Sequence, residues 1–99
     1  MHLSTLQKYI LLKTAEKGGK TDRNIFRPFY YTQSKKPSEK YQEKIITQSL
    51  ERLIDRGLIV GFGRRTPQKW FITQVSLTSK GRLTVTKLRQ EKQGKLPLK

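Results

Sequence analysis

The feature that most constrains the fold is a helical pattern that ends at a glycine and leads directly into a hairpin pattern, within residues 46–82. Four apolar residues recur there at the spacing of one buried helix face: Ile46, Leu50, Leu53 and Ile54. Gly57 follows at the position where a helix end favours a left-handed residue. Strand-like segments at residues 58–62 and 69–78 flank the turn sequence GRRTPQ. This order predicts a helix, a glycine stop and an antiparallel hairpin.

The charge of the chain is strongly positive, because 22 Lys and Arg oppose only 7 Asp and Glu, giving a formal net charge of +15. A balance of this size favours a polyanionic partner. Nucleic acid is favoured over an anionic membrane surface. The excess is concentrated around the hairpin, since no acidic residue lies between Asp55 and Glu91.

Catalytic and metal chemistry have few candidate residues in this sequence. The absence of cysteine excludes disulfides, thiolate metal ligands and thiol catalysis. The only histidine is His2, and the few acids mostly share helices with Lys or Arg, so no acid–base pair stands apart. No glycine-rich phosphate loop or metal-ligand cluster is visible. We therefore expect a protein that is not an enzyme and that needs no cofactor or metal.

The length of 99 residues fits one domain with one modest core. No segment has the apolar length of a signal peptide or a membrane span. We expect a soluble, cytoplasmic protein that does not enter a membrane.

Two of the predicted helices have clear starting residues. The first covers residues 3–17, with Ser4 or Thr5 as its N-cap. The helix that carries the apolar pattern described above begins after Ser38, another good N-cap, and runs to Arg56. We expect the apolar faces of both helices to be buried in a common core.

Between them, a shorter helix begins after Thr21 or Asp22. Pro28 leaves its end open, because the helix can stop just before this proline or a new turn can begin at it. The aromatic residues 29–31 then lead into a polar, basic loop closed by Pro37. These aromatics can pack in the core, the favoured reading for Phe29, or stack on bases as in single-strand binders.

The hairpin and the last helix complete the expected domain. Alternation in the second strand predicts that one set of side chains faces the core: Phe71, Thr73, Val75 and Leu77. Trp70 and Ile72 are then expected on the other face. There they contact the first strand or a partner subunit, or they make no contact. Residues 79–92 predict a helix with a thin apolar stripe, Leu83 and Leu88, and with Val85 off to one side. Residues 93–99 predict a basic, disordered tail.

The side of the 38–56 helix opposite its apolar face carries polar residues: Tyr41, Lys44, Gln48 and Arg52. Such a row can contact base edges in a DNA major groove, because Gln pairs with adenine and Lys or Arg with guanine or phosphate. A solvated helix face without a partner is the alternative. The hairpin favours the first interpretation, since Arg64 and Arg65 are expected at its tip with Lys69 close by, where they can reach a phosphate backbone or a minor groove.

Residues 46–82 resemble the winged-helix transcription regulators of the MarR type. Three segments carry the resemblance: Ile46-Thr47-Gln48 with Leu53, then Arg56-Gly57-Leu58-Ile59, then Leu77-Thr78-Ser79-Lys80-Gly81-Arg82. It implies an α+β fold, a winged helix-turn-helix with a three-helix core, a two- or three-stranded β-wing and a C-terminal helix, spanning residues 1–92. It also implies DNA contacts from the recognition helix and the wing, through Lys44, Ile45, Thr47, Gln48, Arg64 and Arg65.

We therefore expect sequence-specific binding of double-stranded DNA by a small transcriptional regulator. A possible homodimer fits this role, because DNA readers commonly pair two half-sites. A small-molecule effector is not supported, since only one short helix follows residue 78, whereas MarR-type proteins form their ligand pocket and dimer with extra terminal helices. The alternative is a winged-helix module that docks RNA or another protein, which the balanced charge of the recognition helix and the aromatic residues 29–31 leave open.

Overall fold

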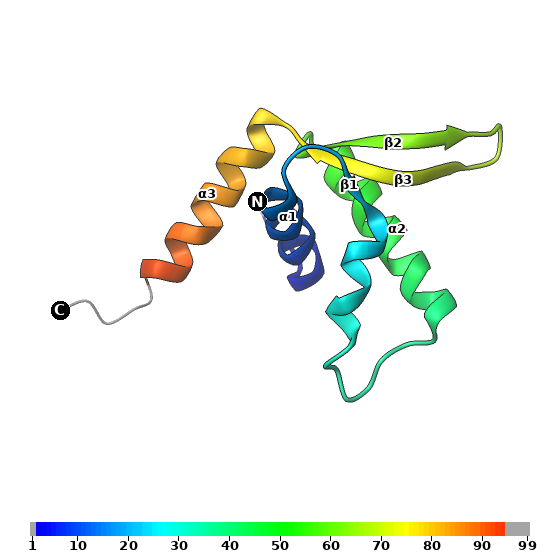
Figure 1. Cartoon of the computed structure of the whole chain (residues 1–99), viewed down its shortest axis with the longest axis horizontal. Coiled ribbons are helices and arrows are strands. Elements are labelled where there is room, and N and C mark those ends of the chain that lie inside the picture. The colour runs from blue at the N-terminus through cyan, green and yellow to red at the C-terminus, as the bar shows by residue number, and fades with distance from the viewer. Residues whose placement is uncertain (1, 95–99) are drawn as a thin grey trace.

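The protein is described by a computed structural model that covers residues 2–94, with side chains up to residue 91. Its elements follow in the order α1 (Thr5–Lys17), β1 (Thr21–Asp22), η1 (Arg23–Tyr30), α2 (Glu39–Asp55), β2 (Ile59–Arg65), β3 (Trp70–Leu77) and α3 (Ser79–Gly94). Figure 1 shows that the β2–β3 hairpin and α3 project from opposite sides of a helical core. This is the predicted α+β arrangement, with the hairpin as the wing.

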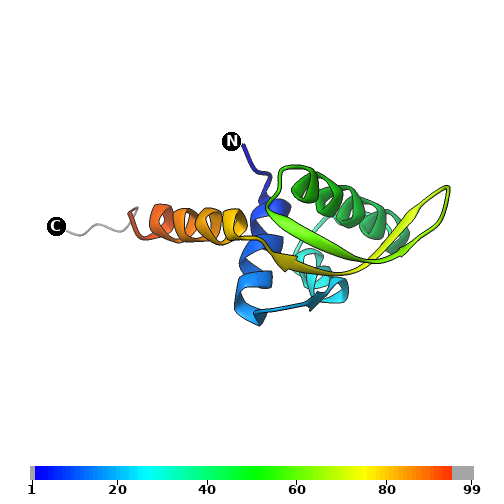
Figure 2. The ribbon, with the colours of Figure 1, turned by 90° about the horizontal axis from the view of Figure 1, so that it is seen from above.

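The sheet has three antiparallel strands in the order β1-β3-β2, so β3 lies in the centre. β1 is only the pair Thr21–Asp22, which lies opposite Val75 and Gln74 of β3. The outer part of the hairpin extends beyond this third strand, and its turn projects past the end of α2 (Figure 2). The wing is therefore three-stranded at its base and two-stranded at its end.

The predicted N-caps of α1 and α2 and the predicted glycine stop of α2 are confirmed, although α1 begins at Thr5 and not at residue 3. Ser4 forms a reciprocal capping box with Gln7, in which each side chain accepts a hydrogen bond from the other residue's backbone amide. Ser38 caps α2 by accepting from the backbone amide of Tyr41 at 3.3 Å. At the other end of α2, Gly57 has a φ of 76°, and the amide of Leu58 donates back to the carbonyl of Leu53. This pattern closes the helix and turns the chain into β2.

The open question at Pro28 is resolved by a 3₁₀ helix. Asp22 caps η1 by accepting from the amide of Asn24, and the helix continues through Pro28 to Tyr30. Tyr30 is buried and its ring packs edge-on against Phe29, whereas Tyr31 is 67% exposed. The first two aromatics of this segment therefore belong to the core and the third to the surface.

One prediction for the hairpin is wrong, because the strand alternation is broken by a β-bulge. Phe62 pairs with Gln74 but Gly63 pairs with Ile72, so Thr73 is an extra residue on β3. An extra residue reverses which side chains face the core beyond it. Ile72 is buried as a result, and Phe71 and Thr73 are exposed, while the predicted inward position of Val75 is confirmed.

The last helix packs only partly as predicted, since Leu88 of the expected stripe is half-buried against the core. Val85 is buried in the core, whereas Leu83, which was expected on the packing face, is 66% exposed. Gly81 explains the orientation, because a Cβ there would lie 2.0 Å from the carbonyl oxygen of Leu58, so the helix can approach the β2 end closely only at a glycine. α3 ends at Gly94, two residues beyond the predicted end, and the rest of the expected tail, 95–99, lies outside the described residues.

The core contains side chains from all the helices and both long strands: Leu3, Leu6, Ile10, Leu11, Phe26, Tyr30, Ile46, Leu50, Leu53, Leu58, Ile59, Ile72, Val75 and Val85. It includes all the predicted apolar positions of α2 except Ile54, which is half-buried against it. Within residues 2–94, no helix combines the length and apolarity needed to cross a bilayer.

Candidate nucleic-acid interface

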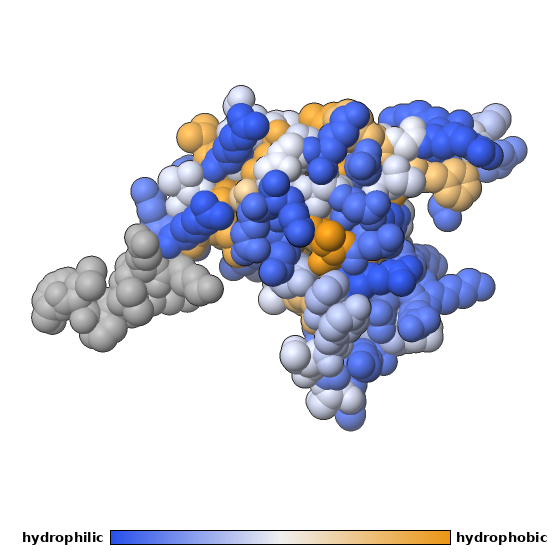
Figure 3. All heavy atoms as spheres, in the orientation of Figure 1, coloured by the Kyte–Doolittle hydropathy of each residue, from blue (hydrophilic) through white to orange (hydrophobic). Residues whose placement is uncertain are grey.

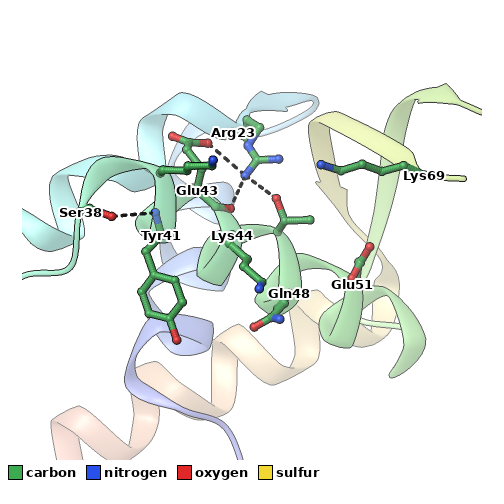
Figure 4. Close-up of a pocket in the computed structure, with 10 residues that line it drawn as sticks. Arg23, Ser38, Tyr41, Glu43, Lys44, Gln48, Glu51 and Lys69 are labelled. Carbon is green, nitrogen blue, oxygen red and sulfur yellow. Dashed lines mark hydrogen bonds and ion pairs between the residues drawn. The ribbon is translucent and has the colours of Figure 1, made fainter.

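The polar side of α2 borders an open groove of about 830 Å³. α2 and its cap contribute most of the lining residues: Ser38, Lys40, Tyr41, Glu43, Lys44, Thr47, Gln48 and Glu51. η1 contributes Arg23, and the turn of the wing contributes Lys69, whose side chain extends over the groove in Figure 4. The structure thus brings Tyr41, Lys44, Thr47 and Gln48 together with Lys69.

The groove has more cationic than anionic side chains. Arg23, Lys40, Lys44 and Lys69 oppose two carboxylates, Glu43 and Glu51. Glu43 is neutralised by two arginines, since it pairs with Arg23 at 3.2 Å and also with Arg27. The net field in the groove therefore favours an anionic ligand.

Arg23 of η1 forms hydrogen bonds with both α2 and β3. Its Nη1 donates to the carbonyl of Ile72 on β3 at 3.1 Å. Its Nη2 donates to the carbonyl of Glu43 at 3.1 Å and to the hydroxyl of Thr47 at 2.7 Å, both on α2 (Figure 4). Burial lowers the pKa of the Arg23 guanidinium, and the nearby carboxylate of Glu43 opposes that shift. A fixed guanidinium thus holds α2, η1 and the base of the wing in one arrangement.

The predicted recognition-helix residues differ in how far they are accessible. Tyr41 is 54% exposed, and Lys44, Gln48 and Arg52 are also exposed. Ile45 is half-buried and packs against the core. The sixth, Thr47, is half-buried as well, and its hydroxyl is held by Arg23. Four of the six side chains are therefore free to meet a ligand directly.

Five groove residues were not predicted as site residues from the sequence: Arg23, Ser38, Lys40, Glu43 and Glu51. Lys40 and Glu51 follow the same helical spacing as Lys44 and Gln48, so a complete projection of α2 identifies them. No local signal identifies Arg23, because its partners lie 24 and 49 residues away in the chain.

The predicted position of the wing arginines at the hairpin tip is wrong. The turn is formed by residues 66–69, in which the amide of Thr66 donates to the carbonyl of Lys69 at 2.7 Å. Arg64 and Arg65 are instead the last residues of β2, paired with Phe71 and Trp70. Adjacent residues of a strand point to opposite faces, so the two arginines cannot act as one pair.

The two faces of the wing end have different surroundings. The guanidinium of Arg65 lies 4.0 Å from the centre of the Trp70 ring. Both residues border a second, shallow groove beside Ile54 and Gly61. Gly61 leaves the space that the Trp70 ring fills, since a Cβ there would be 2.9 Å from the ring and 2.8 Å from Ile54 Cδ1. Arg64 and Phe71 share the opposite face.

Solved structures share this fold. The adhesin competence repressor AdcR from Streptococcus pyogenes matches 94% of the chain with a TM-score of 0.64 and 11% identity. ZitR from Lactococcus lactis matches 95% with a TM-score of 0.63 and 17% identity. MarR from E. coli, solved with operator DNA, matches 89% with a TM-score of 0.60 and 15% identity.

The matches do not extend over the whole of those proteins. The chain spans 58% of AdcR, 56% of ZitR and 54% of MarR. No protein-family model and no curated protein matches the sequence itself. The likeness is therefore one of backbone arrangement, and it confirms the resemblance first inferred from residues 46–82: the chain has the winged-helix fold of the MarR-type regulators.

Proposed function

We propose that this protein binds double-stranded DNA with sequence preference and acts as a small transcriptional regulator. The observation that carries the proposal is the shared groove, in which Tyr41, Lys44 and Gln48 of α2 lie on one surface with Lys69 of the wing. An α-helix fits the DNA major groove, and a hairpin beside it can follow the adjacent backbone. α2 is accordingly the recognition helix, and β2 with β3 is the wing.

Sequence readout is assigned to the exposed polar side chains of α2. Gln48 can form two hydrogen bonds with an adenine, and Lys44 can donate to a guanine. Glu51, which lines the same groove, can accept from the amino group of a cytosine. Tyr41, Thr47 and Ile45 shape the surface around them, with Ile45 and the Thr47 methyl suited to thymine methyl groups.

Affinity is assigned to phosphate contacts. Arg52 on α2 and Arg64, Arg65 and Lys69 on the wing are exposed cations, and Lys69 lines the groove itself. Their contacts with phosphates release counterions from DNA, which makes binding strong at low salt and weak at high salt. These contacts position the protein without reading sequence.

The structural relatives support this assignment. MarR from E. coli was solved with operator DNA, and AdcR is named as a repressor. Both have the fold of this chain, whose groove is lined by Lys44, Gln48 and Lys69, side-chain types that can bind bases and phosphates. We assign regulation of transcription in the cytoplasm on that basis, with a homodimer as the form that binds paired half-sites.

Selection of binding sites from random duplex DNA tests the proposal. We expect a defined motif, and a palindromic motif would indicate that two copies bind together. Gel shifts with duplex DNA, duplex RNA and single strands at matched salt are the companion measurement. No enriched motif, or equal affinity for duplex RNA, would contradict sequence-specific DNA binding and favour a docking module for RNA or protein instead.

A further inference from the structure

Aromatic rings on the hairpin lie next to basic side chains at three places. The ammonium of Lys20 lies 4.4 Å from the centre of the Phe62 ring, and that of Lys69 lies 5.1 Å from the centre of the Phe71 ring. Arg65 covers Trp70, as described above. Figure 3 shows hydrophobic areas beside hydrophilic ones along the wing. Aromatic faces within a basic surface are what proteins use to bind unpaired bases and their phosphates.

Phe71 is the ring that is open to a ligand. It is 45% exposed near the end of the wing, because the bulge at Thr73 turns it away from the core. Its cross-strand neighbour is Arg64, so one ring and two cations, Arg64 and Lys69, share one face. The lysine above the ring is long and flexible, and a base can displace it at low cost.

Trp70 is not open in the same way. One side of its ring system lies against Gly61 and Ile54, and the Arg65 guanidinium lies over the ring. A base would have to displace these neighbours of the ring. Phe71, rather than the only tryptophan of the chain, is therefore the candidate for stacking.

We propose that the Phe71 face of the wing binds single-stranded nucleic acid, with one unpaired base stacked on Phe71 and the neighbouring phosphates held by Arg64 and Lys69. This goes beyond the proposed reading of duplex DNA, in which the bases are stacked on each other and present only their edges. The site uses the wing and none of the α2 side chains. With this site, the protein would bind single strands with exposed bases in addition to duplex DNA.

Fluorescence anisotropy with labelled oligonucleotides tests this site. The probes are an oligothymidylate, an oligouridylate and an abasic DNA strand of the same length, which carries the phosphates without the bases. We expect about tenfold tighter binding of the base-containing strands at equal salt, the scale of one stacked base. An equal affinity for the abasic strand would overturn the proposal, because charge alone would then account for binding.

Substitutions of Phe71 separate stacking from folding. Phe71→Leu should abolish the preference over the abasic strand, whereas Phe71→Tyr should keep it because the ring remains. Val60→Ala is the matched control, since Val60 is an equally exposed apolar residue of the same hairpin, 45% exposed, and this variant should behave like the unsubstituted protein. A preference that survives Phe71→Leu would overturn the proposal, as would loss in Phe71→Tyr together with retained duplex binding.

Two further readouts distinguish this site from other uses of the wing. Polyglutamate added as competitor should displace the oligothymidylate far less effectively than unlabelled oligothymidylate does. Equal displacement would overturn the proposal and indicate a general site for acidic polymers. The duplex motif selected through α2 should be unchanged in Phe71→Leu, so failure of the stacking site and failure of duplex readout are seen separately.

Discussion

The guanidinium of Arg23 donates a 2.7 Å hydrogen bond to the hydroxyl of Thr47, which links the 3₁₀ helix η1 to the centre of α2. The same guanidinium donates to the carbonyl of Ile72 in β3. The orientation of α2 relative to the wing is therefore fixed through one side chain that borders the groove. Thr47, expected as a DNA contact, is also an anchor for this arrangement.

Arg23→Lys should reduce the free energy of unfolding by about 2 kcal/mol, because one ammonium cannot serve the acceptors on α2 and β3 together. Arg27→Lys is the matched control. Within residues 2–94, the Arg27 side chain pairs only with the carboxylate of Glu43, and it is 51% exposed, so its replacement should cost less than about 1 kcal/mol. Urea denaturation measures both, and equal losses would show that Arg23 does not have the linking role.

Gly61→Ala should destabilise the protein by about 1–3 kcal/mol, because the added methyl group overlaps Ile54 Cδ1 and the Trp70 ring. The emission of Trp70, the only tryptophan, should change as the ring moves. Ile54→Val removes Cδ1, so adding it to Gly61→Ala should recover part of the loss. A double variant less stable than the sum of the two single changes would contradict this packing.

Two apolar residues of α3 should respond oppositely to truncation. Val85→Ala should cost about 1–3 kcal/mol, because Val85 is buried against the core. Leu83→Ala should leave the melting temperature of the isolated chain nearly unchanged, since Leu83 is exposed. Calorimetry of both variants is the measurement, and a larger loss for Leu83→Ala would mean that the helix packs through the other face.

The parts of the fold that follow from local chemistry were predictable from the sequence. Ser4 and Ser38 cap helices because their hydroxyls accept from nearby amides, and Gly57 ends α2 because it takes a positive φ. The buried face of α2 follows from its apolar spacing. These are interactions between residues a few positions apart, so the sequence displays them directly.

The remaining features depend on contacts between distant residues. The bulge at Thr73 is visible only in the pairing of β2 with β3, so simple alternation placed Phe71 inside and Ile72 outside. The face that α3 buries is set by the close approach of Gly81 to Leu58. Of the candidate interface, the polar side of α2 was predictable, whereas the groove that includes Arg23 was not.

Replacing Arg64 and Arg65 together by alanine should weaken binding to all duplexes about equally and lower the magnitude of the salt slope by about 1–2, one unit for each of these oppositely facing arginines that contacts a phosphate. The reason is that both side chains are assigned to phosphates and not to bases. Arg82→Ala with Arg89→Ala removes the same charge from exposed positions on α3 and should leave the slope nearly unchanged. An unchanged slope in the wing variant would remove the wing from the interface.

Gln48→Ala tests whether the exposed side of α2 binds DNA with sequence preference. Binding to the selected duplex and to a scrambled duplex is compared at matched salt, with Gln90→Ala on the exposed side of α3 as the control. Gln48→Ala should reduce the ratio of the two affinities by about tenfold, the effect of losing one two-bond contact with a base, while Gln90→Ala keeps it. An unchanged ratio in Gln48→Ala would mean that this side of α2 does not distinguish one DNA sequence from another.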